Sequence, residues 1–152
     1  MKNTKCNNCK SNKLKKIFSL GSLSFSGRFG KNKNEDIPKD FLNLVICNRC
    51  NLVQLDRYFN PRYLYGKGYG YRTGINKTMT SHVKKTVQKA IKLTNLKPGN
   101  FVLDIASNDG TLLSSYPDSI KTVGIDPLIN KYNKYYKKIN FKISSFFQKN
   151  KI

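Results

Sequence analysis

Four cysteines in two C-x-x-C pairs constrain this chain of 152 residues more than any other feature. Cys6 and Cys9 form the first pair, and Cys47 and Cys50 form the second. Four thiolates in two such turns suit tetrahedral zinc and leave no coordination position open for a reaction. Because the pairs lie farther apart than in short zinc ribbons, a small β-domain must join them. The pattern therefore predicts a structural, non-catalytic zinc site.

Other interpretations of the cysteines stay open: two disulfides, a redox-active C-x-x-C, or four unrelated buried thiols. The N-terminus, "MKNTKCNNCK", lacks the apolar core of a signal peptide, which favours the cytoplasm and reduced cysteines. No run of 18 apolar residues occurs, so we expect no membrane span and no membrane partner.

The net charge of +21 raises the question of nucleic-acid binding. Arg, the residue that reads phosphates and guanines with two hydrogen bonds, is scarce beside Lys in this sequence. The lysines are spread along the chain, and the abundance of Lys, Asn and Ile is what AT-rich codon usage would produce. We therefore expect that nucleic acid is not the main partner.

The order of apolar and polar stretches indicates three segments, 1–57, 58–99 and 100–152. The first should hold strand pieces at Phe18–Gly30, a polar loop at Lys31–Asp40 and a strand, cysteine turn and strand at Phe41–Leu55. The second should be a Tyr- and Gly-rich ordered loop, Tyr58–Gly74, followed by a helix that ends near Leu96. Residues Ile75, Met79, Val83, Val87 and Ile91 recur every four positions and predict that helix.

After Gly99 the pattern becomes βαβαβ. Strands are expected at Phe101–Ala106, Lys121–Asp126 and Phe141–Phe147, and helices at Gly110–Tyr116 and Leu128–Lys138. Strands that alternate with helices in this way imply a parallel, doubly wound sheet.

The stretch "VLDIASNDGTLL", Val102–Leu113, predicts a strand, a tight turn and a helix start. Neither the dinucleotide fingerprint G-x-G-x-x-G nor a P-loop lysine is present, so pyrophosphate binding is not expected. The turn carries Asp104 and Asp109, and Asp126 at the end of the next strand can accept hydrogen bonds from ribose hydroxyls. S-adenosylmethionine, a cation with a ribose and no phosphate, fits these acids. An ordinary strand–turn–helix without a ligand is the alternative.

An ordered set of motifs resembles the sugar C-methyltransferases over nearly the whole chain. "CNNCKS", "LGSLSFSGRF" and "LVICNRCNLVQL" resemble the family's zinc-binding N-terminal domain, and "YGYRTGINKTMTSH" resembles its Tyr-rich motif. "VLDIASNDGTLL" and "VGIDPLIN" resemble the first two cofactor motifs of its class I methyltransferase domain. The resemblance implies methyl transfer from S-adenosylmethionine to a ring carbon of a nucleotide-linked keto-sugar.

The resemblance also implies roles for individual residues. The cofactor site would be lined by Asp104, Ala106, Ser107, Asn108, Asp109, Gly110, Thr111, Asp126 and Pro127. The sugar nucleotide would contact Tyr69, Tyr71, Arg72 and His82, and Tyr71 and His82 would be the catalytic candidates. In many class I methyltransferases glycine occupies the positions of Ala106 and Asn108. A histidine that flanks the helix stripe, and tyrosines that pack under a loop, are the structural alternatives.

The expected fold class is therefore α/β: a small zinc-binding β-domain followed by the first βαβαβ half of a Rossmann-like class I methyltransferase sheet. The family's catalytic base and much of its substrate site lie beyond Ile152, so the resemblance implies a truncated form that is inactive alone. A separate C-terminal half could complete it. The alternative function is a zinc-ribbon-like module that binds a partner protein or nucleic acid.

Overall fold

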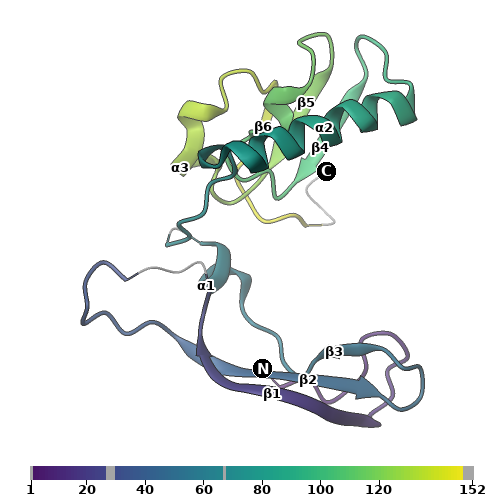
Figure 1. Ribbon diagram of the computed structural model, residues 1–152, viewed down its shortest axis with the longest axis vertical. Coiled ribbons are helices and arrows are strands. Elements are labelled where there is room, and N and C mark those ends of the chain that lie inside the picture. The colour runs from purple at the N-terminus through teal and green to yellow at the C-terminus, as the bar shows by residue number, and fades with distance from the viewer. Residues whose placement is uncertain (1, 27–29, 67, 149–152) are drawn as a thin grey trace. The chain divides into compact units, whose positions relative to one another are not determined.

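A computed structural model describes residues 2–26, 30–66 and 68–148 of the chain (Figure 1). The chain forms two compact units, Met1–Gly70 and Tyr71–Ile152. The boundary lies inside the segment 58–99, so that Tyr69 belongs to unit 1 while Tyr71 and its C-terminal neighbours belong to unit 2. Among the described helices, none combines the length and the apolar character that a membrane crossing needs.

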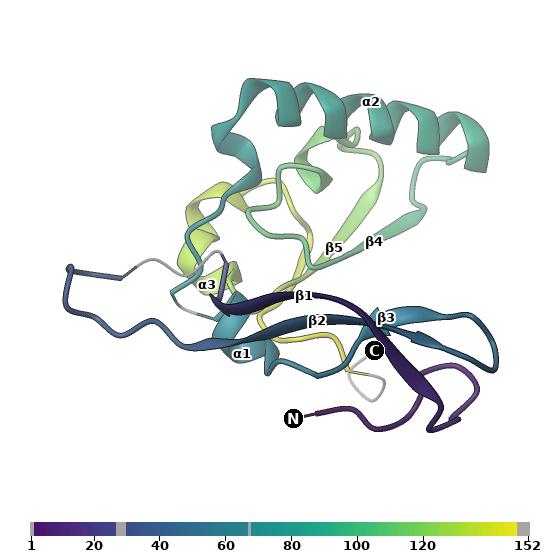
Figure 2. The same ribbon diagram turned by 60° about the horizontal axis from the view of Figure 1, so that its bottom comes forward.

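Unit 1 is built on an antiparallel sheet in the order β1-β2-β3. The strands are β1 (Leu14–Ser24), β2 (Lys39–Cys47) and β3 (Val53–Leu55), and Figure 2 shows the three strands side by side. The predicted strand, cysteine turn and strand are confirmed, because β2 runs into the second C-x-x-C and β3 leaves it. Strand β1 is continuous but irregular between Ser19 and Ser22, where Gly21 has a φ of +74°. Residues 27–29 of the predicted strand pieces lie outside the described residues.

The Tyr-rich stretch contains a short helix that its composition did not predict. Helix α1 (Pro61–Tyr65) begins after Asn60, whose side chain accepts a hydrogen bond from the backbone N–H of Arg62. Asn followed by Pro is a helix-start signal, since Pro at the first helical position has no N–H to leave unpaired. Lys67 of this stretch lies outside the described residues.

The long helix of unit 2 matches its sequence pattern. Helix α2 (Lys77–Thr94) begins at Asn76, whose side chain accepts from the N–H of Met79, and ends at the left-handed Asn95. Val83 and Val87, in the middle of the predicted stripe, are its buried residues. In the views of Figures 1 and 2, α2 runs along the parallel sheet of the same unit.

That sheet consists of β4 (Phe101–Ile105), β5 (Lys121–Ile125) and β6 (Phe141–Ile143) in the order β4-β5-β6. All pairs are parallel, and Asp104 lies opposite Gly124 in the register. The three predicted strands are therefore present, although β6 stops at Ile143, where Ser145 turns back and donates its N–H to the Ile143 carbonyl. The chain is thus a mixed α/β protein with two small sheets.

The two predicted connecting helices are mostly wrong. In place of Gly110–Tyr116 there is a turn and a 3₁₀ helix, Leu113–Ser115. In place of Leu128–Lys138 there is α3 (Ile129–Tyr132), which tightens into a 3₁₀ helix, Asn133–Tyr135. The cause in the second case is Tyr136, which is fully buried and donates its hydroxyl to the Asn108 carbonyl, 3.0 Å away.

The sheet of unit 2 is covered on one face. Leu113 and Tyr136 pack near Gly124, where an added Cβ would lie 3.1 Å from each of their side chains. On the opposite face the alternate residues of β4 are exposed: Phe101 by 65%, Leu103 by 46% and Ile105 by 48%. Strands in parallel sheets normally have both faces covered, so this apolar face is unusual.

Candidate functional site

The two C-x-x-C pairs converge on one point in unit 1. The four Sγ atoms all lie within 4.8 Å of one another. Cys6 and Cys50 are separated by 3.5 Å, and Cys9 and Cys47 by 3.6 Å. Four sulfurs bound to one tetrahedral zinc at about 2.3 Å would be roughly 3.8 Å apart. The donor set and its spacing therefore fit a zinc ion.

The two cysteine turns have the same local hydrogen bonds although they lie in different parts of the chain. The N–H of Cys6 donates to the Ser11 carbonyl at 2.7 Å, and the N–H of Cys47 donates to the Leu52 carbonyl at 2.9 Å. After each second cysteine the backbone takes a left-handed conformation, with φ of +61° at Lys10 and +58° at Asn51.

Each turn is therefore a rigid knuckle that presents two sulfurs to the same side.

Gln54 ties the first knuckle to the sheet. It is buried on β3, where its Oε1 accepts from the N–H of Asn7 at 2.8 Å and its Nε2 donates to the Lys5 carbonyl at 3.4 Å. A polar residue at the inward position of a three-residue strand was the available sequence signal for this role. The second knuckle needs no such link because it joins β2 directly to β3.

The second knuckle favours ionised sulfurs, the form that binds zinc. Hydrogen bonding lowers the pKa of Cys50 to about 6, first from the backbone N–H of Leu52 and then from the other three cysteines. For Cys47, burial is the largest influence and opposes ionisation, but backbone hydrogen bonds from Arg49 and Cys50 help to outweigh it, and the pKa is lowered. The first knuckle differs, because the backbone hydrogen bond from Ser11 is outweighed by burial and by hydrogen bonds with the other three cysteines, which raise the pKa of Cys9 to about 11. The two sulfurs of the second knuckle are therefore the ones prepared to ionise.

A second candidate site lies at the carboxyl ends of β4 and β5 in unit 2. Burial first, and then repulsion from the neighbouring carboxylate of Asp126, raise the pKa of Asp104 to about 6. Burial also raises the pKa of Asp126, although its oxygens accept hydrogen bonds from the N–H groups of Leu128 at 2.7 Å and Asn108 at 2.9 Å. Two adjacent carboxylates that resist ionisation together would be stabilised by a cationic ligand.

The turn between β4 and the 3₁₀ helix alternates in handedness. Ala106, Asn108 and Gly110 have φ of +65°, +51° and +74°. The resemblance to class I methyltransferases led us to expect glycine at the first two positions, and a left-handed backbone suits glycine. Asn adopts this conformation readily, whereas Ala at 106 does so at a cost.

Most of the other residues assigned to the cofactor use their side chains inside the protein. Ser107 is buried against the hydroxyl of Tyr136, at 2.8 Å. Asp109 is 1% exposed and binds Thr111, its Oδ1 lying 2.6 Å from the Thr111 hydroxyl. Pro127 is partly buried in the turn after β5. These residues shape the backbone of the site, and the carboxylates of Asp104 and Asp126 are the groups in position to bind a ligand.

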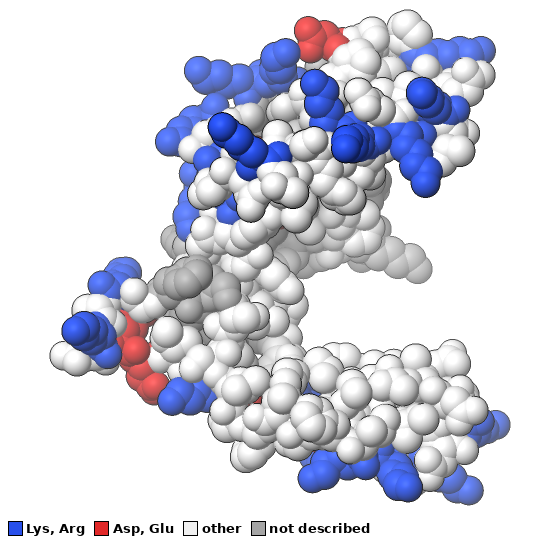
Figure 3. Space-filling view, in the orientation of Figure 1, with Lys and Arg blue, Asp and Glu red and all other residues white. Residues whose placement is uncertain are grey.

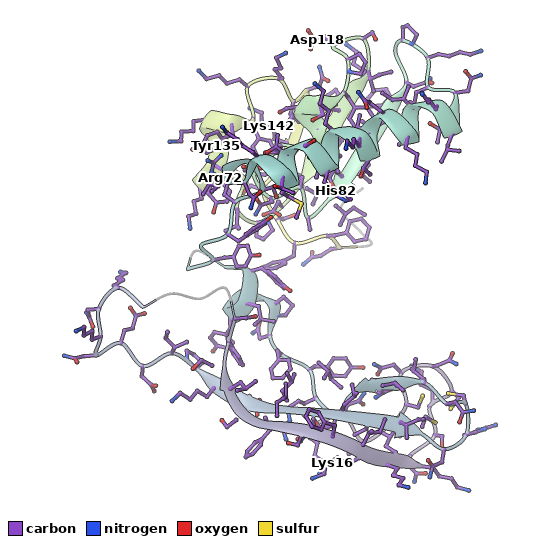
Figure 4. The ribbon with its side chains drawn as sticks, in the orientation of Figure 1. Lys16, Arg72, His82, Asp118, Tyr135 and Lys142 are labelled. Carbon is purple, nitrogen blue, oxygen red and sulfur yellow. The ribbon has the colours of Figure 1, made fainter. Side chains whose placement is uncertain are left out.

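The residues assigned to the sugar nucleotide are divided between the units: Tyr69 lies in unit 1, and Tyr71, Arg72 and His82 lie in unit 2. Tyr69 stacks edge-on against Tyr65 within unit 1, with ring centroids 5.4 Å apart. Tyr71 is exposed at the start of unit 2, and Arg72 lies against the turn after β4. His82 is exposed on α2 (Figure 4), and no contact between its imidazole and that turn is seen among the described residues.

The basic residues are dispersed. On the face shown in Figure 3, Lys and Arg are spread over unit 2 with uncharged surface between them. Nucleic-acid footprints are usually concentrated on one face or along one helix, and the expectation that nucleic acid is not the main partner stays a prediction.

Comparison with known proteins gives two matches. Residues 6–65 match a methyltransferase-associated family profile described as "Putative zinc binding domain", and this range includes all four cysteines. The C-methyltransferase NovU of Streptomyces niveus is 26% identical over 117 residues. The matched part is 75% of this chain but 28% of that protein, so the chain spans little more than a quarter of the relative's length.

The matches agree with the geometry of unit 1. A zinc-binding profile falls on the segment in which four sulfurs converge, and the two observations together support zinc binding. The same matches confirm the resemblance that the ordered motifs predicted.

Proposed function

We propose that the second unit of this chain, which is similar to the N-terminal portion of sugar C-methyltransferases, binds S-adenosylmethionine. The observation that carries the proposal is the carboxylate pair Asp104 and Asp126 at the carboxyl ends of neighbouring parallel strands. Ligands of open α/β sheets bind at that edge. A sulfonium and an ammonium would offset the repulsion between the two acids, and the absence of phosphate agrees with a turn that has no P-loop lysine.

Different residues of the site would bind different parts of this cofactor. Asp126, fixed by two backbone N–H groups, is oriented to accept hydrogen bonds from ribose hydroxyls. Asp104 faces the same edge and favours the cationic part of the ligand. The left-handed turn Ala106–Gly110 brings the backbone close to the space beside these acids. When bound, S-adenosylmethionine would supply the methyl group for transfer.

The substrate we propose is a nucleotide-linked keto-sugar, methylated at a ring carbon. The support is the resemblance of the Tyr-rich motif and the name of the relative, a C-methyltransferase. Tyr71 and His82 remain the catalytic candidates in unit 2. His82 is exposed to solvent on α2. Tyr69 remains a candidate for contact with the sugar nucleotide.

We further propose that activity requires more protein than this chain. The apolar face of β4, formed by Phe101, Leu103 and Ile105, is exposed, and in the described sheet β4 pairs only with β5. Natural proteins avoid exposed strand edges of this kind because they promote aggregation. A C-terminal half that continues the sheet would cover both features, and we expect no methyl transfer by the chain alone.

The binding proposal is tested by titrating the isotopically labelled chain with S-adenosylmethionine and following amide chemical shifts. We expect shifts at the turn 106–110 and at Asp126, with an affinity no better than roughly 100 μM because part of the adenine pocket is supplied elsewhere. Asp126→Asn should abolish these shifts. Asp118→Asn, which changes a carboxylate that is 86% exposed, is the matched control and should leave them unchanged. Shifts that survive Asp126→Asn, or that never involve the turn, would contradict the proposal.

A further inference from the structure

Two sequence motifs that the resemblance assigns to different ligands are hydrogen-bonded to each other. The segment Tyr71–Gly74 lies against the turn Ser107–Thr111, and both belong to unit 2. The Oδ1 of Asn108 accepts from the N–H of Thr73 at 2.8 Å and from its hydroxyl at 3.2 Å. The Nδ2 of Asn108 donates to the Tyr71 carbonyl at 3.2 Å. Asn108 therefore binds the backbone on both sides of residue 72.

Asp109 uses both of its oxygens in the same interface. Its Oδ2 accepts from the N–H of Gly74 at 2.9 Å and from Nη1 of Arg72 at 3.2 Å. Its Oδ1 accepts from the N–H and the hydroxyl of Thr111, at 3.2 and 2.6 Å. The side chain is fully buried, so these four bonds take the place of water around the charge. This carboxylate is occupied by the protein and is not available to a cofactor.

Arg72 is held from two directions (Figure 4). Its guanidinium pairs with Asp109 on one side and lies over the ring of Tyr135 on the other, 4.2 Å from the ring centroid. Arg, with its flat and delocalised cation, suits simultaneous stacking and ion pairing. The Tyr132 hydroxyl adds a bond of 3.1 Å to the Tyr71 carbonyl. Tyr132 of α3 and Tyr135 of the 3₁₀ helix that follows it therefore also hold this segment in place.

Gly74 shows how closely the two segments fit. A Cβ at this position would lie 2.6 Å from the Thr111 hydroxyl and 2.8 Å from Oδ2 of Asp109. These distances are shorter than any non-bonded contact of a methyl group, so a larger residue would force the segments apart. The glycine of the Tyr-rich motif is therefore needed for packing against the turn.

We propose that Arg72 is a positioning residue that acts through Asp109 to fix the β4 turn and, with it, the orientation of Asp126. The link from the turn to Asp126 is the N–H of Asn108, which donates to Oδ2 of Asp126 at 2.9 Å. Arg72 is thus withdrawn from the sugar nucleotide and serves the cofactor edge. The anchoring is a property of the ligand-free chain, whereas its effect on S-adenosylmethionine rests on the proposed function.

Amide hydrogen exchange in the ligand-free chain tests the anchoring directly. Arg72→Gln should speed exchange at the N–H of Gly74 by about tenfold, since a hydrogen bond to a charged group contributes on the order of 1.5 kcal/mol or more. Asp109→Asn should do the same, and the double variant should exchange no faster than the faster single variant, because both changes break one interaction. Arg72→Lys, which keeps the charge without the flat guanidinium, should fall between the wild type and Arg72→Gln.

The control is Arg62→Gln, which removes an exposed guanidinium from α1 in unit 1 and should leave Gly74 unchanged. Protection of the β4 amides of Val102 and Asp104, which face β5 in the parallel ladder, should persist in all variants, and this separates local release from unfolding. Wild-type exchange at Gly74 in Arg72→Gln would overturn the anchoring. In a titration with S-adenosylmethionine, Arg72→Gln should weaken binding by about tenfold. Unchanged binding would overturn the positioning role. If the wild type itself does not bind, the proposed function fails while the exchange data still decide the anchoring.

Discussion

The cysteine cluster of unit 1 and the acidic turn of unit 2 are both short motifs that predict a ligand site, but they use their side chains differently. In unit 1 all four predicted ligands point to one centre, within 4.8 Å of one another. In unit 2 the nine residues assigned to the cofactor lie at the carboxyl ends of β4 and β5, six of them in the turn 106–111, and several of their side chains bind the protein itself. Asp109 is buried and hydrogen-bonded to Arg72, and Ser107 is buried and hydrogen-bonded to Tyr136.

This difference follows from what each motif specifies. A C-x-x-C pair is defined by side chains that must meet at a metal ion, so its spacing determines where the sulfurs go. A strand–turn–helix motif is defined by a backbone path, and its polar residues satisfy the groups that this path exposes. The ligand-facing groups of such a motif are therefore fewer than its characteristic residues.

The largest effect is expected from breaking the cluster in unit 1. We predict one zinc per chain in protein purified without added metal, and complete loss of that metal in Cys47→Ser. Because zinc contributes on the order of 10 kcal/mol to the folding of small metal-dependent domains, unit 1 should unfold in this variant. Elemental analysis and the near-ultraviolet circular dichroism of its tyrosines would measure both effects. Asn8→Ser, an exposed change in the first knuckle, is the control and should keep metal and fold. Four titratable thiols in a folded, metal-free wild type would refute the prediction.

The parts of the fold that the sequence predicted are those set by periodicity along one segment. Alternating side chains predicted β4 and β5. A four-residue repeat predicted the helix stripe that contains Val83 and Val87. The helices after each strand were overestimated because their residues bind distant partners. Tyr136 turns inward to Ser107, and Asp109 bonds to Thr111 and to Gly74, so neither segment can continue as a regular helix.

The same limit applied to the candidate sites. The zinc ligands could be predicted because the sequence carries both members of each pair. The partnership of Arg72 with Asp109 could not, since it joins segments 37 residues apart and leaves no local pattern. For Gln54 the sequence offered a polar residue at an inward strand position, but it gave no sign of the partner Asn7, 47 residues away. The resemblance assigned Arg72 and Asp109 to different ligands, and the structure adds that the two side chains pair with each other.

A smaller effect is expected from glycines in the second unit, where backbone and packing can be separated. Gly110 and Gly99 both have positive φ, of +74° and +85°. A Cβ at Gly110 would lie 2.4 Å from Cδ1 of Ile139, whereas nothing lies within 4 Å of one at Gly99. Gly99→Ala should therefore cost about 1 kcal/mol of unfolding free energy from backbone strain alone, and Gly110→Ala about 3 kcal/mol from strain and overpacking. Chemical denaturation followed at unit 2 would measure the two values. Equal costs would show that the turn adapts and is less rigid than its hydrogen bonds indicate.

The smallest effect concerns Asp104, and its sign distinguishes a ligand-binding acid from a structural one. The folded chain raises the pKa of Asp104 from 3.8 to about 6, mainly by burial and further by repulsion from Asp126. The folded state therefore binds a proton more tightly than the unfolded state, and ionisation of Asp104 destabilises the fold. This cost is absent below about pH 4, grows between the two pKa values and is complete above about pH 6. Asp104→Asn should thus stabilise unit 2 at pH 7.5 by roughly 1 kcal/mol, a value reduced from the full shift because the carboxylate is partly solvated, and should have no such effect at pH 4.

Urea denaturation at the two pH values measures this, with Asp118→Asn as the exposed control. If Asp104 binds a cation, the same variant should weaken S-adenosylmethionine binding while it stabilises the free chain, as expected where stability is sacrificed for function. A variant that is destabilised at pH 7.5 would mean that the ionised Asp104 supports the fold, and the cation-binding role of this edge would lose its physical basis.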